Sequence, residues 1–326
     1  MTTTDDQRPR MRAVIQDRFG GPEVLRVEEV DRPTPIPTEI LVRVHAAGVN
    51  PVDWKTRSGG VVAPDLRRLP LTVGWDVSGV VEAVGWGVTT VQPGDEVYGM
   101  PWFPRRAGGY GQYVTAPSRQ FAPKPTTLSH EQAAAVPLAG LTAWQALVDT
   151  AHVTAGQRVL VHAGAGGVGH LAVQFAKHLG AHVTATASAR NHPWLGEIGA
   201  DEVVDYTTTR FEDVVGDMDV VLDLVGEGLD ATSSRSLRVL RPGGLLVAIP
   251  AGVPPEVAAE AESRGVRATA FLVEPDGPAL ARIGQLIDAG HVRIGVEEVF
   301  PLDRAADAHR RGETGRTRGK LVLRVS

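Results

Sequence analysis

The sequence predicts an α/β protein with two domains, a barrel-like β domain and a doubly wound parallel sheet. Short strand-like runs separated by Gly- and Pro-containing turns fill the first third of the chain, as in antiparallel barrels. From about residue 130 onward, strands alternate with helices, which favours a parallel sheet with helices on both faces. At 326 residues, the chain is long enough for each domain to bury a core of its own.

The β-rich part contains four strand candidates, over residues 11–16, 39–46, 78–84 and 111–116. Between the first two of them, residues 31–38 (DRPTPIPT) place three prolines at alternate positions. Proline removes ladder donors and disfavours helix in the residue before it. We therefore expect an extended connector in this segment.

In the alternating part, periodicity predicts the order of helices and strands. Helices are expected over residues 131–149 and 168–179, and strands over 158–163, 182–188, 202–206, 220–225 and 245–249. In the last part of the chain, helices are expected over residues 278–289 and 303–311, and strands over residues 296–300 and 320–325.

Composition excludes several classes of function. With 33 basic and 38 acidic residues, the formal net charge is −5, which argues against nucleic acid and against a membrane surface as partners. The chain has no cysteine, so disulfides, thiolate catalysis and cysteine-ligated zinc are excluded. Residues 1–10 lack the apolar stretch of a signal peptide. We expect a soluble, cytoplasmic protein.

The segment 159–180 (VLVHAGAGGVGHLAVQFAKHLG) predicts a strand, a glycine-rich turn and a helix. The G-x-G-x-x-G pattern is formed by Gly164, Gly166 and Gly169, with Gly167 and Val168 between them. In this context the first glycine permits a tight turn, the second lets the backbone approach a pyrophosphate, and the third allows close helix–strand packing. The helix N-terminus then offers N–H donors to phosphate. We therefore expect a dinucleotide site.

The end of the next predicted strand indicates which dinucleotide binds. An NAD site usually has an acidic residue about 20 residues after the fingerprint, whereas residues 184–191 (TATASARN) contain none. A hydroxyl from Ser188 and the guanidinium of Arg190 suit the 2′-phosphate of NADP(H). We predict NADP(H) rather than NAD(H).

The chain resembles the zinc-independent quinone oxidoreductases, related to zeta-crystallin, of the medium-chain dehydrogenase/reductase superfamily. The resemblance runs over nearly the whole chain after about residue 11 and rests on separate motifs in the expected order. These are AAGVNPVDWKTRSG (46–59), GWDVSGVVEAVGWGV (74–88), PGDEVYG (93–99), GGYGQYV (108–114), AAAVPLAGLTAWQAL (133–147), GAGGVG, residues 198–206 and the terminal GKLVLRV (319–325).

The resemblance implies a GroES-like catalytic domain over residues 1–128 and 276–326, and a Rossmann NADP(H)-binding domain over residues 129–275. Zinc-dependent relatives carry ligands at positions that hold Asn50 and Trp75 here. Neither an amide nor an indole is a zinc ligand. The resemblance therefore implies hydride transfer without a metal.

For catalysis, the resemblance points to Asn50 and Lys55, on a loop that faces the nicotinamide in similar enzymes. Without a metal, the carbonyl oxygen that gains charge needs hydrogen-bond or proton donors, and Lys55 is a candidate to stabilise the resulting anion. For Asp53 and Asp76 we expect a structural role, holding that loop in shape. Thr142 matches a family position near the nicotinamide, as does Asn50.

Further cofactor contacts are expected at the carboxyl edge of the parallel sheet, where open α/β sheets bind ligands. Tyr206 and Lys320 match family positions that reach the cofactor, and the remaining candidates follow strand ends or line the pocket: Val225, Ile249, Ala251, Phe271 and Val273.

The leading functional hypothesis is an NADPH-dependent, metal-independent oxidoreductase that transfers hydride to a quinone or a related conjugated carbonyl. Two alternatives stay open: an alkenal or enoyl double-bond reductase, and a non-catalytic, crystallin-like NADPH-binding protein. The expected partner is a small quinone or enone. Residues 267–273 are expected to form an edge strand, and the resemblance implies that two such edges pair in a homodimer.

Overall fold

The computed structural model describes residues 9–60, 63–250 and 252–326. The chain divides into two compact units. The first consists of Met1–Leu138, Glu274–Asp288 and Val296–Ser326, and the second of Ala139–Val273 and Ala289–Gly295. The division falls at Leu138, later than the boundary expected at residue 128, and α2 (His130–Ala134) packs against strands of the first unit.

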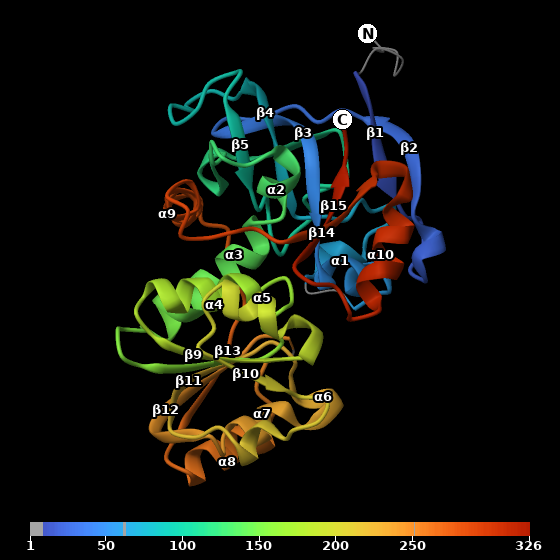
Figure 1. Ribbon diagram of the computed structural model, residues 1–326. Helices are drawn as coiled ribbons and strands as arrows, with labels where there is room; N and C mark the ends of the chain where they lie inside the picture. The colour runs from blue at the N-terminus through green and yellow to red at the C-terminus, as the bar shows by residue number, and fades with distance from the viewer. Residues whose placement is uncertain (1–8, 61–62, 251) are drawn as a thin grey trace. The chain divides into compact units, whose positions relative to one another are not determined.

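The first unit is built on a seven-stranded sheet (Figure 1). Its strands are β3 (Glu39–Val49), β4 (Asp76–Val84), β5 (Glu96–Gly99), β6 (Tyr113–Pro117), β7 (Phe121–Pro123), β14 (Val296–Pro301) and β15 (Lys320–Arg324). The order is β14-β15-β3-β4-β5-β7, with β6 also pairing with β3. A separate antiparallel pair joins β1 (Arg10–Ile15) and β2 (Arg26–Asp31).

The C-terminal strand places distant residues side by side. Because β15 runs antiparallel to β3, Leu321 lies opposite Val49, and Lys320 comes close to the end of β3. Because β3 is antiparallel to β4, Gly48 lies opposite Asp76. Three segments far apart in the sequence therefore meet at one end of this sheet.

The segment that carries Asn50 and Lys55 is a helix, α1 (Pro51–Arg57), and not the loop expected from the sequence. Pro51 occupies the first helical turn, where its missing N–H costs nothing and its fixed φ suits the helix. Asp53 accepts a hydrogen bond from the main-chain N–H of Asn50, which fixes the entry into the helix. The other helices of this unit include α9 (Gly277–Asp288) and α10 (Ala305–Glu313).

The second unit contains a six-stranded sheet in which every pairing is parallel. The strands are β8 (Arg158–Val161), β9 (His182–Ala187), β10 (Glu202–Asp205), β11 (Met218–Asp223), β12 (Leu240–Ala248) and β13 (Arg267–Ala270). Their order is β10-β9-β8-β11-β12-β13. Counted within this unit the order is 3-2-1-4-5-6, the doubly wound arrangement of Rossmann folds. The fold class predicted from the sequence is confirmed.

The long helix expected over residues 131–149 is wrong. The structure has α2, then α3 (Pro137–Trp144), then a π-helical turn over Gln145–Thr150. Pro137 explains the break, because it lacks an N–H and its ring clashes with the preceding helical turn. The remaining helices are α4 (Gly169–His178), α5 (His192–Glu197), α6 (Glu227–Asp230), α7 (Thr232–Ser236) and α8 (Pro255–Ser263).

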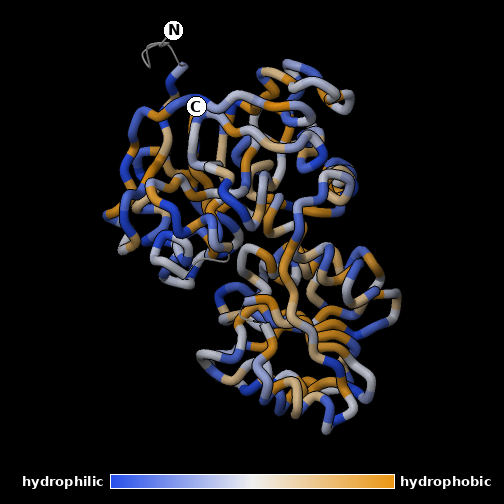
Figure 2. Tube along the Cα trace, turned by 180° about the vertical axis from the view of Figure 1, so that it is seen from behind, coloured by the Kyte–Doolittle hydropathy of each residue, from blue (hydrophilic) through white to orange (hydrophobic). Residues whose placement is uncertain are grey.

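Each unit has its own apolar core. In the first unit, Val42, Val77 and Val97 belong to a buried cluster inside the sheet. In the second, Leu160, Val221 and Leu246 belong to a buried cluster. Figure 2 shows the strands of this unit in the colour of hydrophobic residues. Among the described residues, no helix is both long enough and apolar enough to cross a membrane.

Candidate active site

The glycine fingerprint lies at the topological switch point of the second unit's sheet. The chain leaves β8 toward β9 on one side, while β11 pairs with β8 on the other. Gly164 to Gly169 lie in the connection between β8 and α4, and the turn at Val225 follows β11. Ligands of open α/β sheets bind in the crevice outside the carboxyl ends of the strands at this point.

Two glycines of the fingerprint are required for different reasons. A Cβ on Gly169 would lie 2.2 Å from the carbonyl oxygen of Ala163 and 2.8 Å from the Cα of Gly164, so helix–turn packing forbids a side chain there. A Cβ on Gly166 would meet only the Ala163 carbonyl oxygen within 4 Å, at 3.2 Å. The fold would therefore tolerate a small side chain at residue 166. A dinucleotide bound against the backbone would instead occupy the space of that Cβ.

The turn after β9 carries Ser188 and Arg190, as the sequence indicated. An acidic side chain, Asp205 at the end of β10, also contacts this turn through the main chain of Ala189. Hydrogen bonds from Thr207 and from the main-chain N–H of Ala189 hold the pKa of Asp205 below its usual range. This carboxylate is therefore engaged by the protein itself, unlike the free acid that receives a ribose 2′-hydroxyl in NAD sites.

Several predicted cofactor residues stand just beyond the strands to which the sequence had assigned them. β10 ends at Asp205, so Tyr206 lies outside it and is 61% exposed. Likewise β11 ends at Asp223, β12 at Ala248 and β13 at Ala270. Val225, Ile249, Phe271 and Val273 thus lie in the connections after these strands, Thr142 is buried in α3, and Ala251 lies outside the described residues.

Asp223 shapes the connection after β11. Its Oδ1 accepts hydrogen bonds from the main-chain N–H groups of Val225 and Gly226, both at 2.9 Å, and its Oδ2 accepts from the hydroxyl of Ser233. The carboxylate is fully buried. The Asp223 carboxylate oxygens thus hold the backbone at Val225 in a fixed turn. The sequence instead predicts Val225 as the last residue of a strand.

In the first unit, Asn50 lies at the centre of a buried polar cluster. Its Nδ2 donates to Asp76 Oδ2 at 2.8 Å, and its Oδ1 accepts from the ammonium of Lys320. The main-chain N–H of Asn50 donates to Asp53 Oδ2 at 2.7 Å. Since both ends of the amide and the adjacent N–H are bonded, the orientation of this side chain is fixed.

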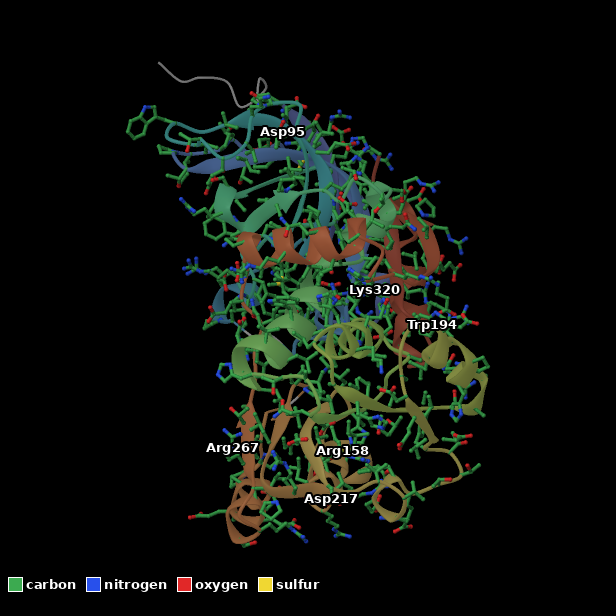
Figure 3. The ribbon with its side chains drawn as sticks, turned by 60° about the vertical axis from the view of Figure 1, so that its left-hand side comes forward. Asp95, Arg158, Trp194, Asp217, Arg267 and Lys320 are labelled. Atoms are coloured by element: carbon green, nitrogen blue, oxygen red, sulfur yellow. The ribbon has the colours of Figure 1, made fainter. Side chains whose placement is uncertain are left out.

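Lys320 is 3% exposed and belongs to an interior strand of the sheet, so it is not an edge-strand surface lysine (Figure 3). Its Nζ donates to the carbonyl oxygen of Val49 at 3.1 Å, bonds Asn50 Oδ1, and lies 3.5 Å from Asp76 Oδ2. An ammonium has three donors, and these three acceptors account for them.

Burial disfavours both charges of the cluster, and each charge is stabilised by the other. Burial raises the pKa of Asp76, against the opposing effects of Lys320, the Asn50 amide and the main-chain N–H of Leu138. Burial lowers the pKa of Lys320, against the effects of Asp76 and Asp53. The charges are close and hydrogen-bonded, as a buried ion pair requires.

Lys55 is placed differently from Asn50. It lies in the second turn of α1 and is exposed to solvent. Asp53, one helical turn from Asn50, is fully buried, and its burial raises the pKa of its carboxyl to about 7. The structure thus brings Asn50, Asp53, Asp76 and Lys320 together and leaves Lys55 outside this cluster.

The two residues that the resemblance places at zinc-ligand positions, Asn50 and Trp75, are both engaged by the protein. The Asn50 amide is bonded to Asp76 and Lys320. The indole of Trp75 is buried, donates its Nε1–H to the carbonyl oxygen of Arg105 at 2.7 Å, and packs edge-on against Phe103. An amide, an indole and an ammonium in one place do not form a donor set for Zn²⁺.

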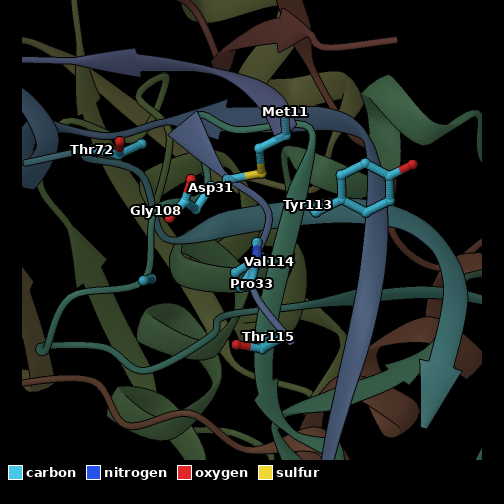
Figure 4. A pocket seen from close by; sticks show the side chains of 9 residues that line it. Met11, Asp31, Pro33, Thr72, Gly108, Tyr113, Val114 and Thr115 are labelled. Atoms are coloured by element: carbon cyan, nitrogen blue, oxygen red, sulfur yellow. The ribbon is translucent and has the colours of Figure 1, made fainter. Parts of the chain in front are cut away.

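A surface hollow of about 180 Å³ in the first unit lies elsewhere (Figure 4). Met11, Thr72, Gly108 and Tyr113 contribute to its lining. Its lining contains none of the predicted site residues.

A Rossmann sheet with a glycine fingerprint at its switch point in one unit, together with a buried Asn–Asp–Lys cluster in the other, defines a dinucleotide-dependent oxidoreductase. Residues 36–126 match the family model of the alcohol dehydrogenase GroES-like domain, and residues 198–323 match that of the zinc-binding dehydrogenases. The chain belongs to the quinone oxidoreductase family of the medium-chain dehydrogenase/reductase superfamily. This confirms the family resemblance identified from the sequence.

Among curated relatives, a mitochondrial NAD(P)H oxidoreductase of Mus musculus is 34% identical, over 100% of this chain and 92% of its own length. An NADPH-dependent alkenal/one oxidoreductase of Arabidopsis thaliana chloroplasts is 36% identical, over 98% of this chain and 81% of its own length.

Among solved structures, the quinone oxidoreductase of Coxiella burnetii is 39% identical with a TM-score of 0.92, over 98% of this chain and 100% of that one. The Escherichia coli quinone oxidoreductase in complex with NADPH is 29% identical with a TM-score of 0.85, over 96% of this chain and 100% of that one.

Proposed function

We propose that this protein is an NADPH-dependent reductase that passes hydride to a quinone or to another conjugated carbonyl without a metal ion. The observation that carries this proposal is the Asn50 amide, fixed between Asp76 and Lys320 where related enzymes hold zinc. The quinone oxidoreductases among the solved structures and the alkenal/one oxidoreductase among the relatives support the choice of acceptor.

In this proposal the second unit is the cofactor-binding domain and the first is the catalytic domain. The backbone at Gly166 and Gly167 and the N-terminus of α4, after Val168, hold the pyrophosphate. Ser188 and Arg190 hold the 2′-phosphate, because a hydroxyl and a planar, permanently charged fork both bind phosphate oxygens. When bound, NADPH supplies the hydride.

Asn50 acts on the acceptor through its side-chain amide. The amide has two N–H donors, and Asp76 Oδ2 accounts for one of them. We assign the second to the acceptor oxygen on which negative charge develops during hydride transfer. A donor that is already held in place needs no reorganisation as this charge forms.

Lys320 strengthens that donor rather than contacting the cofactor. Its ammonium bonds Asn50 Oδ1, so it draws electron density away from the amide nitrogen. Its three donors are accounted for inside the protein. Lys55 is exposed on α1, and we assign to it an approach to a bound anion from solvent.

An acceptor assay tests the proposed function directly. We expect NADPH oxidation, followed by nicotinamide absorbance, with quinones or with 2-alkenals, a clear preference over NADH, and no loss after treatment with a chelator. Turnover with alkenals alone would make the acceptor an activated double bond. Loss of activity on chelation, restored by Zn²⁺, would contradict metal-free transfer, and tight NADPH binding without turnover would contradict an enzymatic role.

For the assembly, we propose a homodimer through β13. This strand is at the edge of the six-stranded sheet, and Arg267 in it is exposed (Figure 3). An edge strand presents unpaired backbone groups to a partner strand, and Leu272, just beyond it, is 57% exposed. We also propose a cytoplasmic location, although the mouse relative is named as mitochondrial.

A further inference from the structure

A chain of buried hydrogen bonds connects α10 to Asn50, and neither Tyr110 nor His309, its middle members, was singled out from the sequence. Arg57 at the end of α1 bonds His309 of α10, His309 bonds Tyr110, and Tyr110 bonds Asp53. All four side chains are at most 2% exposed. The chain ends on the carboxylate that holds the main-chain N–H of Asn50.

The direction of every hydrogen bond in this chain is determined by its first member. The Arg57 guanidinium can only donate, so Nδ1 of His309, 3.2 Å away, must accept and the ring proton must be on Nε2. That Nε2–H then donates to the Tyr110 oxygen at 3.2 Å. The Tyr110 hydroxyl is left to donate to Asp53 Oδ2, at 2.9 Å.

His309 fits the neutral form that this direction requires. Its burial, and then the charge of Arg57, lower its pKa to about 3, so the ring stays neutral across the physiological range. Arg57 is in turn fixed by an ion pair with Glu313 and by a hydrogen bond from its Nε to the carbonyl oxygen of Gly20. The origin of the chain is therefore anchored on α10 and on a separate loop.

Packing fixes α1 against α10 in the same region. The ring of Trp54 lies edge-on to His309, with ring centroids 6.2 Å apart. A Cβ on Gly312 would lie 2.6 Å from the Trp54 ring, so α10 approaches α1 as closely as a glycine allows. The hydrogen-bond chain thus runs through a rigid contact between two helices.

Asp53 depends on this chain for its orientation. Its Oδ2 accepts from the main-chain N–H of Asn50 and from the Tyr110 hydroxyl, and no described residue bonds its Oδ1. Without Tyr110, the main-chain N–H of Asn50 would be the one described donor to this carboxylate. A rotation of the carboxylate would then release Asn50 at the start of α1.

We propose that Tyr110 and His309 are positioning residues, which keep Asn50 in place by holding Asp53 in the orientation that bonds its main-chain N–H. This inference rests on the proposed function in one respect, that Asn50 acts at the reacting atoms. The positioning of Asn50 itself is independent of the reaction.

The test compares Tyr110→Phe with Tyr98→Phe. Tyr98 is a matched control, because it is equally buried in the first unit and its hydroxyl also makes a buried hydrogen bond, to the carbonyl oxygen of Leu280 at 2.6 Å. Both variants lose one buried hydroxyl, but only Tyr110 is connected to Asn50. Two quantities are measured in each: hydrogen exchange of the Asn50 main-chain N–H, and kcat and KM for NADPH oxidation with the acceptor that the wild-type protein uses.

We expect Tyr110→Phe to speed exchange at Asn50 and to lower kcat by about tenfold or more with little change in the KM for NADPH, the pattern of an interaction lost in the transition state. Tyr98→Phe should leave both quantities near wild type. His309→Leu should resemble Tyr110→Phe, and His309→Gln should restore part of the activity, because its amide can still donate to Tyr110.

Exchange at Asn50 that is equal in the two tyrosine variants would overturn the positioning role. Faster exchange at Asn50 without a change in kcat would leave the positioning intact and overturn the catalytic role of Asn50. The exchange measurement needs no turnover, so it decides the positioning role even if no acceptor is reduced.

Discussion

Replacement of Lys320 by methionine is expected to destabilise the first unit strongly. Methionine keeps most of the length of the side chain but removes the cation that faces Asp76. A buried carboxylate left without its partner costs about 3–5 kcal/mol. Chemical unfolding followed by tryptophan fluorescence measures this loss of stability.

A double replacement separates the loss of the ion pair from the loss of packing. Asp76→Asn/Lys320→Met also removes the carboxylate that faced Lys320, so the double variant should be more stable than Lys320→Met alone. Lys177→Met is the matched surface control: Lys177 pairs with Asp201, its side chain is 46% exposed, and its loss should cost at most about 1 kcal/mol. A cost for Lys320→Met no larger than this control would contradict the account of the cluster.

Replacement of Gly166 by alanine is expected to separate cofactor binding from folding. The added Cβ would meet one carbonyl oxygen at 3.2 Å, which a small shift relieves. It would also occupy the space through which the backbone approaches the pyrophosphate. We expect the affinity for NADPH to fall by about tenfold or more, or at least about 1.4 kcal/mol, while the Tm changes little.

Two glycine variants control this experiment. Gly169→Ala places its Cβ 2.2 Å from a carbonyl oxygen, so it should lower the Tm as well as the affinity. Gly216→Ala adds a methyl group in open space before β11, at the opposite end of the sheet, and should affect neither. If Gly166→Ala binds NADPH as tightly as the wild-type protein, the cofactor does not lie against this backbone.

The Rossmann half could be predicted from the sequence because its signals are local. A strand, three spaced glycines and an amphipathic helix are adjacent in residues 159–180, and the strand order observed in the structure places this turn at the switch point. The ends of strands were less predictable. The sequence pattern predicts strands that end at Tyr206 and Val225, whereas hydrogen bonding to Asp205 and Asp223 turns the backbone there.

The sequence contains a signal for the helix after Asn50. The resemblance implies a loop in this segment, but Pro51 predicts a helix start, because proline is common at the first helical position. Pro137 is the opposite case, a proline inside an apparently continuous helix that does break it. In both segments the position of proline, rather than the hydrophobic pattern, determines where a helix begins.

The polar cluster could not be predicted from sequence patterns. Asn50, Asp76 and Lys320 come from β3, β4 and β15 or their ends, and only the pairing of these strands brings them together. The role of His309 in orienting Asp53 depends on a contact between two helices near opposite ends of the chain. Side chains that meet through tertiary structure alone leave no periodic signal.

In the proposed function, the fixed Asn50 amide takes the place of a metal in assisting hydride transfer. Single-turnover oxidation of bound NADPH, started by mixing with a quinone or an enone, tests it in the wild-type protein and in Asn50→Ala. We expect Asn50→Ala to slow this step by about a hundredfold, as for loss of an oxyanion donor, with NADPH affinity unchanged. An equal rate in the two proteins would contradict the claim.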